Sequence, residues 1–197
     1  MQVQKSSLRP PRNKRDNELR KARLDGGLFY GRTMVDLTPD CTRCAALCCV
    51  ALAFDRGNMF AFDKPAGMAC KHLAGHGCGI HADLESTGLR GCVQYQCDGA
   101  GQRVVQEVFA GQSWQDDPAL LRSMLEAFAQ MRQVHGLLAL LDTAKGLPLP
   151  AAQRVELAAL EARLSPKAWT PECLAAFECS DLRKVVRGFL QSLKSLF

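Results

Sequence analysis

The chain has 197 residues, of which 47% are hydrophobic and 23% are charged, a composition typical of a globular protein with one sizeable core. No apolar run reaches the roughly 18 residues that a membrane-spanning helix needs, so we expect no membrane span. The polar, basic N-terminus lacks the apolar segment of a secretory signal, so we expect a cytoplasmic protein in a reducing environment.

The net charge of +5 is concentrated in residues 1–24. This leader contains eight basic and two acidic side chains, a net +6, which leaves the remaining chain at −1. Because the leader has almost no apolar content, we expect it to be disordered, and a solubilising tail is the favoured interpretation. Contact with nucleic acid is a weaker alternative, since no aromatic residue among the charges offers a surface for stacking on bases.

Residues 25–112 are predicted to form a cysteine-rich module with few regular elements. Eight cysteines in 57 positions amount to about 14%, above the roughly 8–10% that marks a scaffold built on cysteines. The intervening segments, such as GHGCG and STGLRGC, are rich in glycine, and the GAG at residues 99–101 is interpreted as a turn. The eight cysteines are Cys41, Cys44, Cys48, Cys49, Cys70, Cys78, Cys92 and Cys97.

Three interpretations of these cysteines are possible: disulfides, buried free thiols and metal ligands. In a secreted protein the density would indicate disulfides, but in a reducing compartment it favours metal ligation. Buried free thiols explain one or two cysteines better than eight close together. We therefore predict that all eight are metal ligands, and that a metal supplies folding free energy that this module lacks.

Residues 113–197 are predicted to form a helical region, because apolar residues recur there with helical spacing. The fourth of its helices has an apolar stripe from Leu182 to Leu196, which needs a partner in the chain or in another protein. The predicted fold is therefore mainly α, with an irregular cysteine-rich metal-binding module packed on a C-terminal helical bundle. The four helices are expected over residues 118–146 and 151–164, from residue 171 onward, and over 180–197.

The spacing of the first cysteines bears on the identity of the metal. If residues 41–49 formed an intact helix, Cys41 and Cys48 would lie about 10.5 Å apart along its axis. Sulfurs that bind one zinc ion lie only about 4 Å apart. The segment CTRCAALCC also lacks the glycine and proline that usually shape zinc knuckles. We therefore prefer an iron–sulfur cluster and keep zinc as the alternative, unless the segment is an irregular loop.

The downstream stretch, ACKHLAGHGCGIHADLESTGLRGCVQYQC, completes a longer pattern. C-x2-C-x3-CC is followed by C-x2-L, then C-x-I, then C-x4-C. This pattern resembles the YkgJ-type cysteine-cluster family, which is described as zinc- or iron-chelating, and all eight cysteines match it. Over about residues 35–145 the chain resembles still more closely the cysteine-rich module that precedes pentapeptide repeats in some bacterial proteins. The resemblance implies metal binding but no settled activity.

The sequence departs from these relatives in two ways. It has no pentapeptide repeats, and His81 stands where the YkgJ-type pattern has an aromatic residue followed by Arg-Pro. His81 lies three residues after Cys78, a spacing that suits metal ligation. The corresponding position in the family is not a ligand type, so His81 is a weaker candidate than the cysteines. The remaining histidines and cysteines have expected structural or solvated roles: His72 and His76 in loops, His135 on a helix, and Cys173 and Cys179 as buried thiols.

The favoured function is binding of an iron–sulfur cluster or zinc, in a structural, redox or sensing role. One alternative is a metal-dependent enzyme that modifies protein side chains, because flagellin lysine methylases have a similar cysteine pattern. No general acid or base beyond the cysteines supports it, and no catalytic residue is assigned. Another alternative is a zinc-stabilised interaction module that binds a protein partner through the C-terminal helix.

Overall fold

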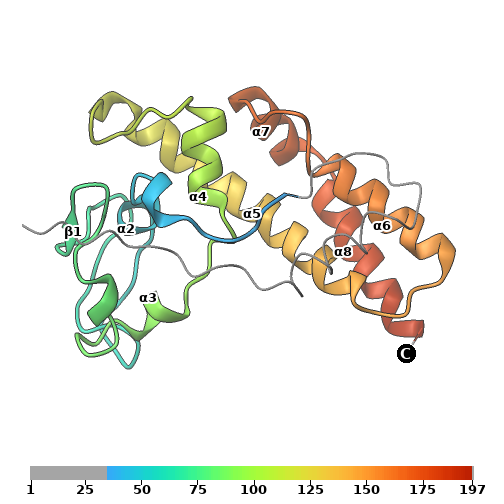
Figure 1. Ribbon diagram of the computed structural model, residues 1–197, viewed down its shortest axis with the longest axis horizontal. Helices are drawn as coiled ribbons and strands as arrows, with labels where there is room; N and C mark the ends of the chain where they lie inside the picture. The colour runs from blue at the N-terminus through green and yellow to red at the C-terminus, as the bar shows by residue number, and fades with distance from the viewer. Residues whose placement is uncertain (1–34, 197) are drawn as a thin grey trace, which may run out of the picture. The chain divides into compact units, whose positions relative to one another are not determined.

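The computed structural model of the chain describes residues 35–196 (Figure 1). The basic leader over residues 1–24 lies outside this range, so its predicted disorder and its possible contact with nucleic acid stay predictions. Most of the regular structure is helical, and the two strands are each two residues long. The predicted mainly α fold is therefore confirmed. None of the helices in the described part of the chain is long and apolar enough to cross a membrane.

The longest element is helix α5, Leu121–Lys145, which continues a 3-10 turn at Pro118–Leu120 (η4). The predicted start is confirmed, because the Asp117 carboxylate accepts a hydrogen bond of 3.0 Å from the backbone N–H of Ala119. At 100° per residue, the buried side chains of α5 cover an arc of about 200°, wider than the apolar stripe of a helix with one packed side. They are Met124, Ala127, Phe128, Met131, Val134, His135, Leu137, Leu138, Leu141 and Ala144.

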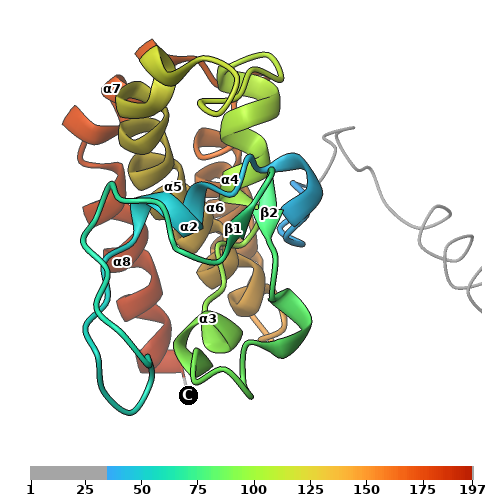
Figure 2. The same cartoon turned by 90° about the vertical axis from the view of Figure 1, so that its left-hand side faces the viewer.

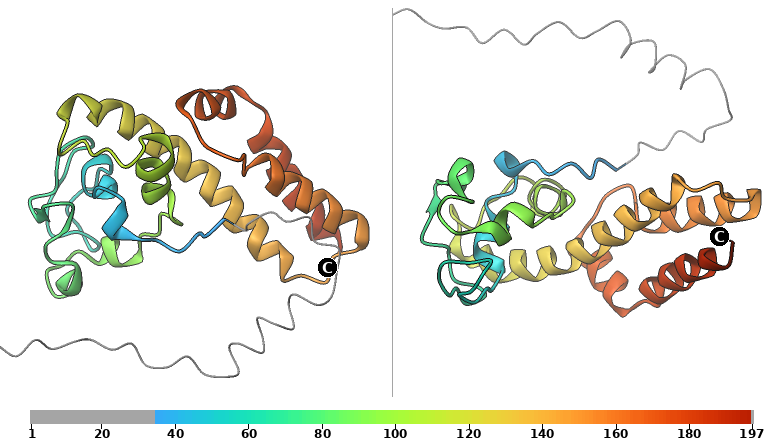
Figure 3. Two further views of the ribbon diagram at one scale, coloured as in Figure 1. Left: turned by 45° about the horizontal axis from the view of Figure 1, so that its top comes forward. Right: turned by 90° about the horizontal axis from the view of Figure 1, so that it is seen from below.

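Three further helices pack on one part of this arc (Figures 1 and 3). They are α6, Ala151–Arg163; α7, Pro171–Cys179; and α8, Leu182–Leu193, which a 3-10 turn at Lys194–Leu196 (η5) extends. The Thr170 hydroxyl caps α7 by accepting a hydrogen bond of 3.2 Å from the Cys173 N–H. The predicted apolar stripe of α8 is buried within the chain through Leu182, Val186, Phe189 and Leu193. A protein partner for this helix stays a prediction.

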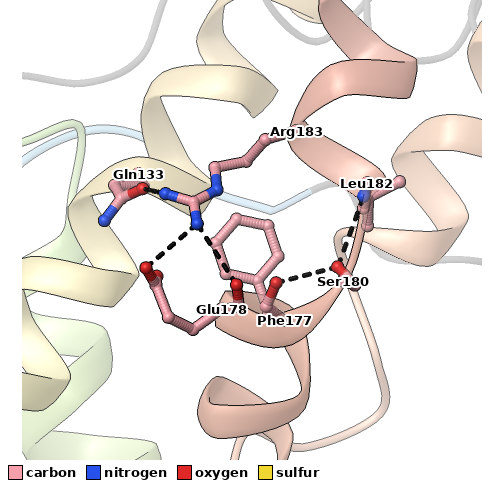
Figure 4. A network of polar contacts seen from close by, with 6 residues as sticks. All are labelled: Gln133, Phe177, Glu178, Ser180, Leu182 and Arg183. Atoms are coloured by element: carbon pink, nitrogen blue, oxygen red, sulfur yellow. Dashed lines mark hydrogen bonds and ion pairs between the residues drawn. The ribbon is translucent and has the colours of Figure 1, made fainter.

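Arg183 joins α5, α7 and α8 at one corner of the bundle (Figure 4). Its guanidinium donates to the Gln133 side chain on α5, and to the carbonyl and carboxylate of Glu178 at 3.2 and 2.9 Å. The same group lies over the ring of Phe177. At this corner the Ser180 hydroxyl donates to the Phe177 carbonyl at 2.8 Å, which fixes the turn between α7 and α8.

The cysteine-rich part packs on the other side of the arc through short elements (Figures 1 and 2). A helix that the sequence did not predict, α4, begins at Ala100, directly after the left-handed Gly99, and becomes a π-helical turn (η3). The elements are η1, Cys41–Arg43; α2, Leu47–Ala51; β1, Leu73–Ala74; β2, Gly77–Cys78; η2, His81–Asp83; α3, Arg90–Gln94; α4, Ala100–Arg103; and η3, Val104–Val108.

His135 attaches the end of the cysteine-rich stretch to α5. Its side chain is 1% exposed, and Nδ1 donates a hydrogen bond to the Asp98 carbonyl. Burial lowers the pKa of His135, which favours the neutral imidazole. Asp98 has a φ of +49°, in the left-handed region, which aspartate adopts more readily than most residues with a side chain. The hydrogen bond from the histidine therefore fixes the backbone of the residue after Cys97.

Replacing His135 tests this attachment. We expect His135→Leu to lower the free energy of unfolding by about 1–3 kcal/mol, because the Asp98 carbonyl loses its donor in a buried position. His135→Asn should recover part of the loss, since its amide nitrogen stands close to the position of Nδ1. Chemical denaturation of the two variants measures the difference. Equal losses would show that the hydrogen bond does not matter.

Candidate metal centre

The segment that contains the first four cysteines is not an intact helix. η1 ends at Arg43 and α2 begins at Leu47, and between them Ala45 and Ala46 have φ values of 47° and 52°. Of the two alternatives, an intact helix or an irregular loop, the structure therefore has the irregular one. The axial separation of Cys41 and Cys48 that counted against a single zinc ion does not apply. The two left-handed alanines adopt a conformation that usually needs glycine.

Side chains from later in the chain hold this break in place. The indole N–H of Trp114 donates to the Ala45 carbonyl at 2.9 Å, and the Gln106 amide donates to the Arg43 carbonyl at 3.3 Å. At the start of η1 the Asp40 carboxylate accepts from the Thr42 N–H at 3.0 Å. Because Ala45 and Ala46 are both buried, larger side chains would crowd the break.

Helix α4 approaches one side of this segment closely. A Cβ atom on Gly101 would lie 3.0 Å from the Cβ of Cys44 and 3.6 Å from the ring of Phe128, so only glycine fits without displacing a neighbour. The Cys97 carbonyl accepts from the Ala100 N–H at 2.9 Å, which places Cys97 at the entrance to α4. The Cys44 thiol donates to the Cys41 carbonyl at 3.3 Å. Cys41, Cys44 and Cys97 therefore gather where η1 meets α4.

The β1–β2 hairpin approaches the other end of α2. The Cys70 N–H donates to the Cys49 carbonyl at 2.9 Å, and the Leu73 N–H donates to the Cys70 carbonyl at 2.9 Å. In the hairpin Leu73 is the antiparallel partner of Cys78. These backbone contacts bring Cys49, Cys70 and Cys78 into one neighbourhood although 29 positions separate the first from the last.

Aromatic packing brings α3, and with it Cys92, to the hairpin side. The Gly91 N–H donates to the Met59 carbonyl at 2.9 Å, and the ring of Phe60 covers Gly91 so closely that any side chain there would collide with it. Phe60 in turn stacks on Phe54, with ring centroids 4.2 Å apart. The Phe54 backbone pairs with Lys64, six residues before Cys70.

The thiols are close enough to affect one another's ionisation. Burial raises the pKa of Cys92, and Cys48, Cys70 and Cys78 raise it further. Burial likewise raises the pKa of Cys44 to about 12 and that of Cys41, with Cys48 contributing to both. A hydrogen bond with the Cys49 side chain, together with burial, raises the pKa of Cys48. These four thiols are therefore neutral near pH 7 unless a cation stabilises the thiolates.

The cluster contains one buried cation, Lys64, which is 4% exposed. Its ammonium donates to the carbonyls of Val50 at 3.3 Å, Pro65 at 3.2 Å and Leu52. Burial lowers the pKa of Lys64, while the nearby thiols act in the opposite direction. Those thiols belong to Cys70, Cys49, Cys48 and Cys92. The Lys64 ammonium therefore lies within electrostatic reach of four of the cysteines.

The Tyr95 hydroxyl is a second polar group beside the thiols. It is buried and has no hydrogen-bond partner among residues 35–196. Burial raises the pKa of Tyr95, Arg132 over its ring acts in the opposite direction, and Cys97 and Cys48 contribute to the increase, so the hydroxyl is a neutral donor within electrostatic reach of two thiols. Sulfur that carries negative charge accepts hydrogen bonds better than a neutral thiol, so the orphaned donor fits a site that contains thiolates.

The candidate ligands do not point toward a single common position in the structure. Within the described residues, no three histidine, cysteine or acidic side chains have the arrangement of a metal-ion site. All eight predicted cysteines lie in the cysteine-rich part, and all ten cysteines of the chain are free thiols. Cys173 and Cys179 lie on α7, the first packed against the core and the second exposed, so the prediction of a buried thiol is wrong for Cys179.

The histidines have other neighbours or face solvent. The ring of His72 lies edge-on to Phe62, with centroids 5.8 Å apart. His76 has Nδ1 3.5 Å from the Ser113 hydroxyl and Nε2 4.0 Å from the Asp116 carboxylate. His81 is exposed in η2. Sequence reasoning missed Lys64 and Tyr95, and the signal for Lys64 was its position in FAFDKP, between aromatic residues and proline.

Comparison with known proteins gives one informative match. No family model matches the chain, and no solved structure matches it. Over 123 residues the chain is 40% identical to the uncharacterised protein YybG of Bacillus subtilis (strain 168). The match covers 62% of this chain but 44% of YybG, so the chain spans less than half the length of that relative.

Gly101 offers a test of the close approach between α4 and Cys44. Alanine favours a helix over glycine by about 1 kcal/mol, so Gly136→Ala, which meets open space on α5, should stabilise the protein by up to that amount. Gly101→Ala should instead destabilise it, because crowding against Cys44 costs about 1–3 kcal/mol. Thermal unfolding of both variants measures the contrast. If both stabilised the protein equally, the observed packing would be wrong.

Lys64 offers a test of the buried cation. We expect Lys64→Met to lower the free energy of unfolding by about 1–3 kcal/mol, because carbonyls at the end of α2 lose their donor. The control is Lys71→Met, whose exposed ammonium lies 4.0 Å from the ring of Phe62 and should cost about 0.5–1 kcal/mol. Denaturant titration compares them. An equal effect would mean that Lys64 is an ordinary surface lysine.

Proposed function

We propose that this chain is a metal-binding protein in which the clustered cysteines ligate a metal as thiolates. The observation that carries the proposal is the concentration of eight thiols around α2, with the Lys64 ammonium among them. A metal bound by four thiolates carries net negative charge, so a buried cation next to four cysteines suits it electrostatically. The donor set fits either zinc or an iron–sulfur cluster, both of which are bound by four cysteines.

The structure weakens the reason for preferring iron. That preference rested on an intact helix over residues 41–49 and on the absence of knuckle glycines. The left-handed Ala45 and Ala46 bend the chain as such glycines would. Both metals therefore stay within the proposal, and a cytoplasmic location belongs to it because thiol ligands must remain reduced.

Metal binding would also complete the folding of the cysteine-rich part. Since the thiols lie near one another without converging, binding would draw them together and deprotonate them. Structural zinc in small peptides contributes on the order of 10–16 kcal/mol, which is large compared with the net stability of most domains. We therefore propose a structural role for the metal as a minimum; the match to YybG adds no activity to it.

Purification without oxygen, followed by elemental analysis and an absorption spectrum, tests the proposal. We expect stoichiometric metal in the wild type and clearly less in Cys44→Ser. The matched controls Cys173→Ser and Cys179→Ser should retain the wild-type amount, since neither lies in the cluster. Iron with sulfide would identify an iron–sulfur protein, and zinc in a colourless protein would identify the alternative. A wild type without metal, or controls as depleted as Cys44→Ser, would refute the proposal.

A further inference from the structure

The eight thiols fall into two groups, and the division begins at the adjacent Cys48 and Cys49. Side chains of neighbouring residues leave a helix about 100° apart, and the Cys48 and Cys49 side chains, joined by a hydrogen bond, stand at the junction of the two groups. Cys48 packs against the main core, as Cys97 does, whereas the Cys49 carbonyl accepts from the Cys70 N–H, three residues before the hairpin. Figure 1 shows helix α2 between the β1–β2 hairpin and α4.

The first group lies on the α4 side. Cys41 and Cys44 are joined by the hydrogen bond from the Cys44 thiol to the Cys41 carbonyl, and Gly101 of α4 packs directly on Cys44. Cys97 precedes the same helix. The Cys41 thiol interacts electrostatically with those of Cys48 and Cys97. Each contact links two cysteines of this group or links the group to α4.

The second group lies on the hairpin side. The hydrogen bond between Cys70 and Cys49 and the pairing of Leu73 with Cys78 connect three of its members. Cys92 interacts electrostatically with Cys48, at the junction of the two groups, and with Cys70 and Cys78 of this group. Lys64 is associated with this group, because three of the four cysteines that act on its ammonium belong to it, and the fourth is Cys48 at the junction.

Four thiolates complete the coordination of one tetrahedral zinc ion or one cubane iron–sulfur cluster. A single centre would therefore leave four of the eight thiols without a metal to bind. We propose that the chain holds two metal centres, one on each side of α2. The first would be ligated by Cys41, Cys44, Cys48 and Cys97, and the second by Cys49, Cys70, Cys78 and Cys92. This inference rests on the proposed function and adds the number of centres and the ligands of each.

The amount of metal per chain, measured on the full-length protein isolated without oxygen, tests the inference directly. The absorption spectrum assigns the kind of centre, and elemental analysis for zinc, iron and sulfide then gives the number of centres. We expect two zinc ions or two clusters per chain. One centre per chain would overturn the inference and leave the proposed function standing, whereas no metal would refute both.

Paired substitutions assign the ligands. We expect Cys41→Ser/Cys44→Ser and Cys70→Ser/Cys78→Ser each to retain half of the wild-type metal, and the combination of all four substitutions to retain none. Far-UV circular dichroism checks that the helices from α5 onward stay folded. Complete loss of metal in either folded double variant would mean one shared centre. If Cys41→Ser/Cys44→Ser unfolds, Cys97→Ser replaces it, and if Cys70→Ser/Cys78→Ser unfolds, Cys49→Ser replaces it. Each of these single variants is expected to lose half of the metal.

Discussion

The structure depends on the wide buried face of α5. One part of this face packs against α6, α7 and α8, and another receives α2 and α4 from the cysteine-rich part. The main core runs through both, from Leu47 and Val104 to Phe189 and Leu193. The hairpin side has fewer buried apolar side chains, since Val50, Leu84 and Leu89 are buried there but lie outside the main core. The α4 side of the cysteine cluster is therefore supported by packing, whereas the hairpin side depends on local contacts.

The helical region was predictable because its signals are local. Proline follows a capping residue at Asp117 and at Thr170, and Gly146 ends α5. Helix α4 was not predictable in the same way, since Gly99 and Gly101 indicate a turn. Glycine is favoured at position 101 because a Cβ there would lie only 3.0 Å from the Cβ of Cys44, which is a tertiary constraint absent from local sequence.

The clustering of the cysteines follows from their density, but their grouping does not. The break at Ala45 and Ala46 runs against alanine's preference for right-handed helix, and its support from Trp114 comes from 69 positions along the chain. The burial of Lys64 was also difficult to predict, because lysine is almost never buried unless its charge is compensated, and its aromatic neighbours in FAFDKP are only a weak signal. Three carbonyl acceptors satisfy its donors, and only the fold shows that they converge.

The magnitudes decide what must hold this region together. Each of the two left-handed alanines costs about 1–2 kcal/mol, and an unpaired buried donor such as the Tyr95 hydroxyl costs a similar amount. The Trp114 hydrogen bond returns only about 1 kcal/mol. Burial of Val50, Leu84 and Leu89 offsets part of this strain and of the entropy of ordering a glycine-rich chain, at about 1.5–3 kcal/mol for a fully buried side chain. The metal ligation proposed above would add a contribution on the order of 10 kcal/mol, larger than any one of these, and would fix the hairpin and α3 against α2.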